Sequence, residues 1–298
     1  MARSIGVLAT HFIWTGVVEE LQLSGVRMYP PPGAAPVDLK VLHADEICER
    51  ICEGIAGLAE DGPVDSVGAG FPGIVREGVI QESPNLGQLK GEDMGTKLAC
   101  ALESVGIKAP VTVINHVDAL AAGLAATRGS LEKLIRVWYL GDGIGFGRYP
   151  RTPAPWEAGH SVVSLDPKER YCGCGGVGHL EGIMGNRAMR LRFLDMEPEE
   201  VFAEARRGDQ RASDFVKRWH RALAAGTASL VHAEGPGRFY IAGPNADFVN
   251  LEMLGRYLID MVKMSSLQGT FFEIVPTSHD LALIGAAVSS RSNAIAIG

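Results

Sequence analysis

The sequence predicts an α/β fold, in which strands alternate with helices along the chain. Three observations lead to this prediction: a strand-rich start, later segments with apolar residues at helical spacing, and β-branched runs that end in glycine turns. At 298 residues, the chain is long enough for two modest domains or one large one. The 46% hydrophobic and 21% charged residues are an ordinary balance for a globular protein.

The individual elements follow in chain order. Thr, Val and aromatic residues predict a short antiparallel meander over Ile5–Leu8, Phe12–Glu20 and Gly25–Tyr29, which the run Pro-Pro-Pro-Gly at 30–33 ends. A helix is expected over Ala44–Glu60. The later expected elements are strand Val64–Phe71, helix Met94–Val105, strand Val111–Asn115, helix Asp118–Thr127, strand Val137–Leu140, helices Asn186–Leu194 and Ser213–His232, strand Arg238–Ala242 and helix Leu281–Ser289.

The most informative chemical pattern lies between residues 157 and 181. Glu157-Ala-Gly-His160 is followed by Cys172-Gly-Cys174-Gly-Gly-Val-Gly-His179-Leu-Glu181. Two thiols and two imidazoles are what a closed tetrahedral zinc site needs, and the glycines let the backbone wrap tightly around one ion. Four protein ligands leave no position for a catalytic water, so we expect structural zinc. Glu157 and Glu181 are not needed as ligands and are free to accept hydrogen bonds from a polyhydroxylated ligand.

This pattern resembles the signatures of the ROK family of repressors, uncharacterised reading frames and sugar kinases. The signatures are Glu-x-Gly-His and Cys-x-Cys-Gly-x-x-Gly-Cys-x-Glu, and only His179 departs from them, in place of the third cysteine. Histidine also ligates zinc, so the change keeps four ligands. Further matches lie in family order along the chain: Gly70-Phe-Pro-Gly73, Pro84-Asn85-Leu86, Gly141-Asp-Gly-Ile-Gly145, Ile241-Ala-Gly-Pro244 and Gly285-Ala-Ala287.

The resemblance implies an actin-like ATPase (ribonuclease H-like) fold, with two α/β domains and a sugar in the cleft between them. The small domain would span residues 1–115 plus the C-terminal helix at about 280–298, and the large domain 116–279 would carry the zinc site. A homodimer is implied as well. The residues expected to contact the sugar are Asn85, Asn115, Glu157, His160 and Glu181, and those expected to bind zinc are His160, Cys172, Cys174 and His179.

Three departures from the family pattern concern ATP. Family kinases open with Asp-x-Gly-Gly-Thr, whereas this chain has Leu8-Ala-Thr-His-Phe12. The catalytic Asn-Asp pair is here Asn115-His116, and Asp142 replaces a threonine in the second phosphate loop. A carboxylate there would repel a triphosphate unless a cation compensates. The resemblance therefore implies a degenerate nucleotide site at Gly141, Asp142, Gly143 and Gly243, and argues against ATP and Mg²⁺ as cofactors.

The retained sugar-facing set and the altered ATP-facing set leave three interpretations open. In the first, the protein binds a sugar or cyclitol and uses His116 as a general acid/base, since an ordinary imidazole has a pKa of about 6.5. The second is a non-catalytic sugar sensor, in which His116 is idle. The third is an active glucokinase-like enzyme, with His116 as base and Asp118 or Asp142 binding magnesium. Trp156 either stacks on a sugar face or packs internally.

Composition excludes other classes of partner. The net charge is −7 and no Lys/Arg run is present, so we expect no nucleic-acid surface. No helix-turn-helix segment precedes the fold, which argues against the repressor branch. No window approaches the roughly 18 apolar residues of a membrane span, and the start has no signal-peptide pattern, so we expect a cytoplasmic protein without a membrane partner. Cys48 and Cys52 lie at helical spacing among isoleucines, as expected for reduced core residues.

Overall fold

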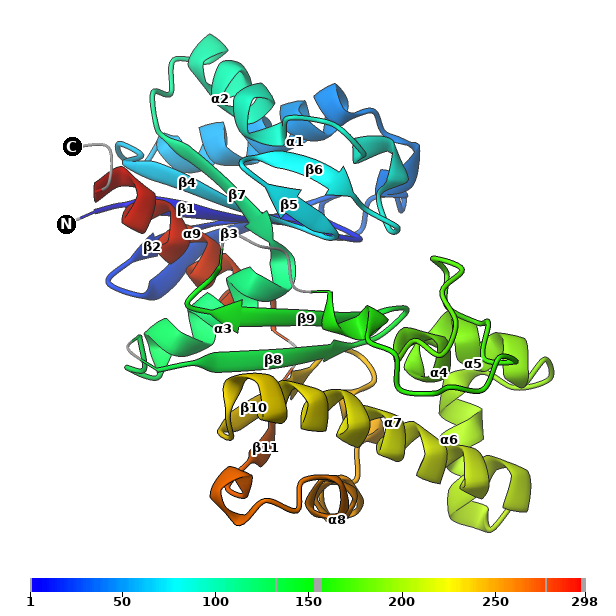
Figure 1. Ribbon diagram of the computed structural model, residues 1–298. Coiled ribbons are helices and arrows are strands. Elements are labelled where there is room, and N and C mark those ends of the chain that lie inside the picture. Colours follow the sequence, from blue (N-terminus) through cyan, green and yellow to red (C-terminus); the bar gives the residue numbers. More distant parts are fainter. Residues whose placement is uncertain (1, 132, 153–156, 277, 296–298) are drawn as a thin grey trace. The chain divides into compact units, whose positions relative to one another are not determined.

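The computed structural model describes residues 2–131, 133–152, 157–276 and 278–295. It is a mixed α/β protein made of two compact units (Figure 1). Unit 1 comprises residues 1–135, 147–155 and 278–298, and unit 2 comprises residues 136–146 and 156–277. Within the described residues, no helix combines the length and the apolar character needed to cross a lipid bilayer.

The central sheet of unit 1 has five strands in the order β3-β2-β1-β4-β7. The first three strands pair antiparallel and form the expected meander, whereas β4 and β7 extend the sheet in parallel from β1. Their bounds are β1 Ser4–Ala9, β2 Ile13–Glu19, β3 Gln22–Tyr29, β4 Ser66–Phe71 and β7 Val111–Asn115. A short hairpin of β5 (Ile74–Arg76) and β6 (Val79–Glu82) was not expected, because its strands are too short to show a period.

Helices cover both faces of this sheet (Figure 1). Helices α1 (Ala44–Ala59) and α2 (Met94–Ser104) enclose an apolar core on one side; it contains the buried, free thiols of Cys48 and Cys52, as expected. Helix α9 (His279–Ile295) lies on the other side against β1 and β4. There the sheet presents glycines, and a Cβ on Gly68 would lie 1.8 Å from the carbonyl oxygen of Ala286. The bare backbone therefore lets α9 approach closely.

Helix α3 (His116–Thr127) belongs to unit 1, whereas the expected domain boundary at residue 115 assigned it to the larger domain. The physical reason is a close crossing with α9. A Cβ on Gly123 would lie 1.8 Å from the carbonyl oxygen of Leu281, and one on Gly285 would lie 1.8 Å from that of Ala119. Two glycines that face each other's helix in this way cannot be recognised from the spacing of apolar residues.

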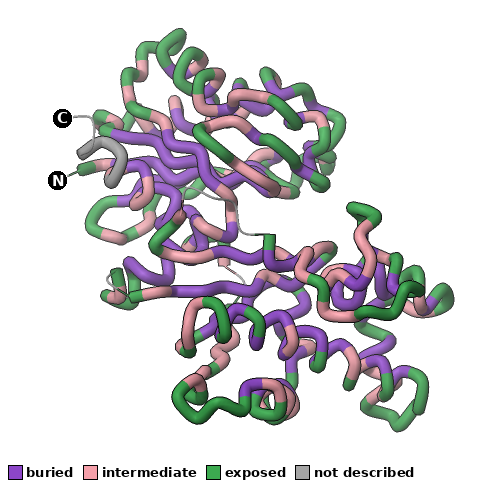
Figure 2. The backbone as a smooth tube through the Cα atoms, in the orientation of Figure 1, coloured by how far each residue is buried: buried purple, intermediate pink, exposed green. Residues whose placement is uncertain are grey.

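Unit 2 is built on a four-stranded sheet in the order β11-β10-β8-β9. Strands β8, β10 and β11 are parallel, and the helices that follow bury a large apolar core around Trp138 and Trp219. Figure 2 shows the buried backbone running through the strands and along the inner side of α7. The bounds are β8 Ile135–Leu140, β9 Ile144–Tyr149, α4 Glu181–Met184, α5 Asn186–Arg192, α6 Pro198–Arg207, α7 Gln210–Glu234, β10 Arg238–Ala242, α8 Leu251–Met261 and β11 Phe271–Ile274.

Several elements of unit 2 were not expected, although their start signals are present in the sequence. Helix α6 begins with a capping box between Glu197 and Glu200 and has a proline in its first turn, and Asn250 caps α8. Strand β9 follows the glycine loop at residues 141–143 directly, so the two strands around this loop form a tight connection. This loop and the segment 157–181 position the candidate site of unit 2.

Candidate functional site

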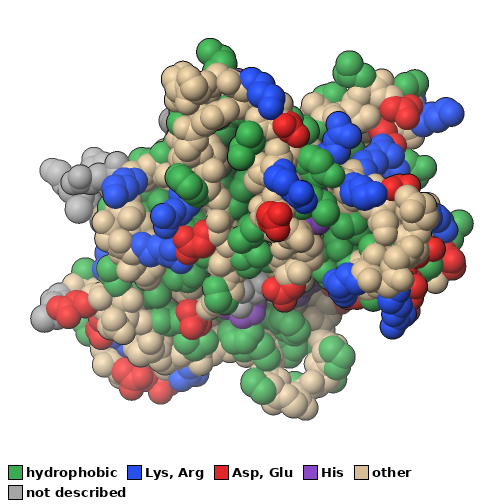
Figure 3. Space-filling view, turned by 90° about the horizontal axis from the view of Figure 1, so that it is seen from below, with side chains coloured by type: hydrophobic (Ala, Val, Ile, Leu, Met, Phe, Trp, Pro, Cys, Tyr) green, Lys and Arg blue, Asp and Glu red, His purple; other side chains and the backbone are tan. Residues whose placement is uncertain are grey.

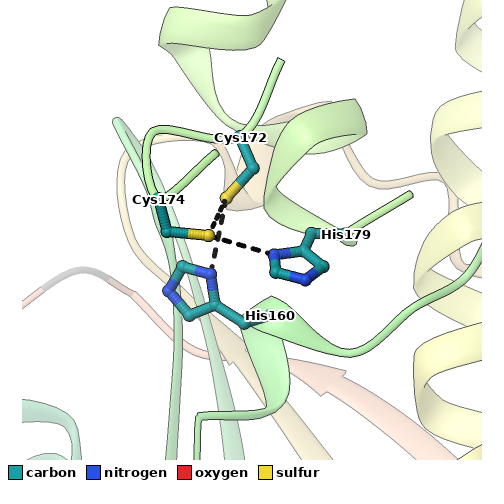
Figure 4. Close-up of side chains that lie close together, drawn as sticks. All are labelled: His160, Cys172, Cys174 and His179. Atoms are coloured by element: carbon teal, nitrogen blue, oxygen red, sulfur yellow. Dashed lines mark hydrogen bonds between the residues drawn. The ribbon is translucent and has the colours of Figure 1, made fainter. Parts of the chain in front are cut away.

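The four predicted zinc ligands converge in unit 2. One ligand atom from each of His160, Cys172, Cys174 and His179 lies within 4.8 Å of all the others (Figure 4). The Sγ of Cys172 is 3.4 Å from Nδ1 of His160 and 3.3 Å from the Sγ of Cys174, which in turn lies 3.2 Å from Nδ1 of His179. Ligand atoms around one tetrahedral zinc ion are separated by roughly 3.3–3.8 Å. The donor set suits zinc, and these three separations are close to those that one ion requires.

The His160 ring is held so that its two nitrogens face different groups. Nδ1 faces the thiols, while Nε2 lies 3.8 Å from a carboxylate oxygen of Glu157. A carboxylate behind a ligating imidazole sets the tautomer and makes the ligand more basic. The His179 ring meets the His160 ring edge-on, with centroids 5.4 Å apart, so each imidazole limits the rotation of the other.

The protonation of the cluster depends on whether a metal ion is bound. Burial raises the pKa of the Cys172 thiol to about 12, and burial together with the nearby His160 lowers the pKa of His179. Without an ion, a protonated thiol and a neutral imidazole are the stable forms at neutral pH. Zinc, which binds thiolates and neutral imidazoles, would displace the thiol protons, and four protein ligands would give it a structural role.

Glycines let the two signature segments fold onto their neighbours. A Cβ on Gly159 would lie 1.8 Å from the carbonyl oxygen of Ile144, and one on Gly178 would lie 1.8 Å from that of Ser164. Gly178 also has a positive φ of 72°, which favours glycine. The backbone N–H of Val163 donates to Gly178, and that of Leu180 donates to Ser161. These bonds join the segment after His160 to the segment around His179.

Glu181 connects the metal cluster to the glycine loop. One of its carboxylate oxygens accepts the backbone N–H of Ile144 at 3.1 Å, and the other lies 3.4 Å from the Sγ of Cys172. A Cβ on Gly143 would come within 2.6 Å of the first oxygen. Ile144 thus contacts both signature segments: its carbonyl oxygen faces Gly159 and its N–H binds Glu181.

The predicted nucleotide residues of unit 2 lie around a buried amide network. Asn245 donates to Asn186 at 2.6 Å, and Asn186 lies 3.3 Å from a carboxylate oxygen of Asp142. The guanidinium of Arg190 is 3.9 Å from the same oxygen, although it also donates to Glu197 at 2.7 Å. The carboxylate that we expected to repel a triphosphate therefore has a cation beside it. Gly141 and Gly143 form the turn, and Gly243 adopts a positive φ of 96° next to Leu140.

The altered kinase positions of unit 1 also come together. Leu8 is only 5% exposed, and its Cδ1 would lie 3.4 Å from a Cβ placed on Gly70. The Cα of His116 would lie 3.3 Å from the same Cβ. In the turn that follows, the backbone N–H of Thr10 donates to the carbonyl oxygen of Phe12 at 3.0 Å. The Thr10 N–H, which the family pattern would direct at phosphate, is therefore hydrogen-bonded within the turn.

Burial shifts the pKa values of two groups on α3 in opposite senses. Burial lowers the pKa of His116 to about 4; a hydrogen bond with the backbone of Phe71 offsets part of the shift, and nearby His11 adds to it. Burial raises the pKa of Asp118 to about 6, although its carboxylate accepts the backbone N–H of Arg148 at 3.0 Å. At neutral pH, His116 is a neutral imidazole, and Asp118 is directed at the backbone that follows Gly147.

The two predicted sugar-binding asparagines of unit 1 differ in their surroundings. Asn115 caps α3 by accepting the N–H groups of Val117 and Asp118, and its amide nitrogen donates to Gly73 at 2.7 Å. It therefore has a structural role at the strand–helix junction. Asn85 is exposed in the loop between β6 and α2. The sugar-contact role of both residues stays a prediction, and Trp156 lies outside the described residues.

The model of the ROK family matches residues 43–289, which is most of the chain. The chain belongs to the ROK family. Among ROK relatives, the glucokinase of Pyrobaculum calidifontis is 29% identical over 262 residues, covering 80% of this chain and 84% of that protein. The N-acetylmannosamine kinase of Haemophilus influenzae is 26% identical over 260 residues, covering 82% and 83%.

The fold is that of ROK sugar kinases. The crystal structure of a ROK hexokinase from Thermus thermophilus superposes with a TM-score of 0.81 and 21% identity, and the alignment covers 99% of both chains. The predicted actin-like ATPase fold is thereby confirmed. Sequence reasoning missed the partners that surround the site, namely Arg190 beside Asp142 and the buried Glu169 between Arg192 and Arg218. Isolated charges in a sequence do not reveal which of them will meet.

Proposed function

We propose that this ROK protein binds a sugar or cyclitol in a pocket braced by zinc, and that it does not perform ATP-dependent phosphoryl transfer. The observation that carries the proposal is the state of the kinase positions in unit 1. Leu8 is buried where family kinases carry an acid on the magnesium side, and the Thr10 N–H is bound within its own turn. Neither group is suited to hold Mg²⁺ or a phosphate.

The state of His116 bears on whether the protein is an enzyme or a sensor. With its pKa lowered to about 4, the imidazole is neutral near pH 7 and is a poor proton donor and a weak base. This supports the sensor interpretation over one in which His116 acts as general acid/base. The sequence expectation for acid/base work used the ordinary pKa of about 6.5, which applies to a solvated imidazole.

Sugar recognition is supported by the carboxylates next to the cluster. Glu157 is partly exposed beside His160, and Glu181 lies between Cys172 and the glycine loop. Anionic carboxylates held by a rigid neighbour are strong acceptors for sugar hydroxyls. Zinc would be held by His160, Cys172, Cys174 and His179, where it would act as a structural brace for Glu157 and Glu181. That Asn85 and Asn115 also contact the sugar stays part of the proposal, on the family resemblance alone.

The test combines binding with turnover. The purified full-length chain is titrated calorimetrically with hexoses, amino sugars and cyclitols, with and without Mg-ATP, while a coupled assay follows ADP. We expect at least one of these ligands to bind, no dependence on Mg-ATP and no ADP. Sugar-dependent release of ADP would overturn the loss of phosphoryl transfer, and absence of binding across the whole panel would overturn sugar recognition.

Two further measurements sharpen this test. Glu157→Gln keeps all four metal ligands and should weaken sugar binding about tenfold, the cost of one charged hydrogen bond. Glu273→Gln, on β11 of the same unit, is the matched control and should bind like the wild type. Following each bound sugar by NMR without nucleotide separates sensor from enzyme, because only an enzyme changes the spectrum of its ligand with time.

A glucokinase-like enzyme is the second candidate, favoured by the cation beside Asp142. Arg190 lies 3.9 Å from this carboxylate and would offset its repulsion of a phosphate chain. In this alternative His116 is the base, and Asp142 or Asp118 binds magnesium. Asp118 is less suited to this task, because its carboxylate already accepts the Arg148 N–H. The ADP assay described above decides between the two candidates.

A further inference from the structure

A buried ion cluster contacts the metal-binding segment, by which we mean residues 171–182 with Cys172, Cys174 and His179. The cluster contains none of the predicted ligands or sugar contacts. Glu169, which is 5% exposed, precedes Cys172 by three residues. Its carboxylate forms close ion pairs with Arg192, at the end of α5, and with Arg218 on α7. Burial alone would raise the pKa of Glu169, but the hydrogen bonds from the two arginines bring it below the usual value, so the group is ionised at neutral pH.

Arg192 is the centre of this cluster because it contacts both ends of the metal-binding segment. Its guanidinium donates to the carbonyl oxygen of Gly182 at 2.9 Å, just after Glu181. It also stacks over the ring of Tyr171, 4.0 Å from the ring centroid, just before Cys172. The Arg192 side chain is only 11% exposed, and its own carbonyl oxygen accepts a hydrogen bond from Arg211 at 2.6 Å. Both the side chain and its backbone are therefore held in place.

Glu169 adds a third connection through its backbone. Its carbonyl oxygen accepts the N–H of Gly178 at 2.8 Å, one residue before His179. Where the two ends meet, a Cβ on Gly182 would lie 2.9 Å from the backbone nitrogen of Cys172. The segments that carry Cys172, His179 and Glu181 are thus linked through one buried ion pair, and a planar guanidinium is suited to reach several acceptors at once.

We propose that Arg192, acting with Glu169, is a positioning residue that sets the metal affinity of the site by holding the Cys172 and His179 segments in the binding conformation before the ion arrives. The inference rests on the proposed metal site and is independent of the sugar. A buried ion pair is weak evidence for stability, but in some proteins it fixes one arrangement of the chain, because desolvated charges need their partner. Groups that orient metal ligands typically change metal affinity by roughly 10–100-fold when they are removed.

The experiment measures Co²⁺ affinity, with Zn²⁺ in competition against a chelator, on the purified full-length chain. Cobalt bound by two thiolates and two imidazoles gives visible absorption that reports its coordination. We expect Glu169→Gln and Arg192→Met each to weaken metal binding about 10–100-fold. Arg192→Lys keeps the charge but not the planar contacts, so it should recover only part of this loss. Arg218 is 41% exposed, and Arg218→Ala should cost less than about threefold, since Arg192 still holds Glu169.

Two controls separate positioning from general stability. Arg238→Met removes an exposed ion pair with Glu273 in the sheet of the same unit and should leave metal affinity within about twofold of the wild type. The double variant Glu169→Gln/Arg192→Met removes both charges, so it should fold better than either single variant. If metal affinity recovers with thermal stability in the double variant, the cluster is merely structural and the proposal fails.

The remaining outcomes are equally decisive. Wild-type metal affinity in Glu169→Gln and Arg192→Met would overturn the positioning role. A wild-type chain that takes up no Co²⁺ would overturn both the metal site and this inference. A chain that binds Co²⁺ with the expected dependence on Arg192, yet binds no sugar, would overturn the proposed function alone.

Discussion

The two candidate regions of this protein differ in how they use polar groups. In unit 1, the positions that serve ATP in family kinases have become apolar or buried: Leu8 packs beside Gly70, and the His116 imidazole has lost most of its basicity. In unit 2, the segment 157–181, which carries the candidate metal ligands, keeps polar side chains that have partners. Glu181 binds Ile144, His160 faces Cys172 and Glu157, and Glu169 lies between two arginines.

The contrast shows why a single substitution should cost more stability in one region than in the other. A buried polar network is stable only when all its members are satisfied, so the loss of one member leaves several others without partners. When leucine replaces an acid in a hydrophobic strand, no neighbouring polar group is left without a partner. Retention of Glu181 and Asn115 consequently has a structural reason that does not require a sugar, because both already accept backbone N–H groups. Experiments have to separate ligand binding from this structural role.

The largest expected effect comes from breaking the metal-binding region itself. Cys174→Ala removes an exposed thiol that contacts both Cys172 and His179, so three ligands remain. We expect loss of stoichiometric zinc and a fall of at least about 100-fold in sugar affinity, since the flanking carboxylates lose their brace. Metal analysis and calorimetry measure the two effects. Cys100→Ala on α2 removes another exposed thiol and should change neither. If the zinc-free variant bound sugar with wild-type affinity, sugar binding would not depend on the metal.

A smaller effect is expected from a glycine that joins this region to the glycine loop. Gly159→Ala places a Cβ 1.8 Å from the carbonyl oxygen of Ile144, where only backbone movement relieves the clash. We expect the free energy of unfolding to fall by about 3 kcal/mol. Gly255→Ala in α8 has open space and should instead gain about 0.5–1 kcal/mol from the better helix former. Denaturant unfolding measures both, and equal effects at the two glycines would refute the close contact at Gly159.

The smallest expected effect is on the pH dependence of stability, which reports the burial of Asp118 in unit 1. Burial raises the pKa of Asp118 from near 3.8 to about 6, so the folded state binds this proton more tightly than the unfolded chain does. The contribution of Asp118 to stability is therefore complete below pH 3.8 and is lost as the pH rises through 6. Asp118→Asn should remove this loss and raise the free energy of unfolding at pH 7 by about 1–3 kcal/mol. Unfolding curves from pH 4 to 8 measure it.

His116 serves as a control, because its contribution to stability changes with pH in the opposite direction over a similar range. Its pKa is lowered from 6.5 to about 4, so its contribution to stability is present above pH 6.5 and is lost as the pH falls through 4. His116→Gln should remove that acid-side loss and leave the Asp118 slope visible. If both variants follow the wild-type curve, neither group is buried as described, and the contrast between the two regions weakens.

The sequence alone was sufficient to predict the elements that depend on the local pattern of residues. The meander of β1–β3, helix α1 and the buried strand β4 follow from the local pattern and content of residues. Strands β1 and β4 are buried along their whole length and α1 buries one face, whereas β3 is largely exposed. The four candidate metal ligands lie within twenty residues of one another, so their glycine-rich connections leave few ways to fold them apart. Weakly periodic pieces such as β5, β6 and α4 were missed, because a few residues do not display a period.

By itself, the sequence determined the α/β class, the family and the candidate metal ligands, because motifs and periods are local properties of a chain. Only the tertiary structure decided which unit holds α3, which cation lies beside Asp142 and which charges surround Glu169. Glycine-mediated helix crossings, burial and ion pairing depend on residues that are distant in sequence. The pKa of His116 is the clearest example, since its lowering comes from desolvation that the surrounding fold alone creates.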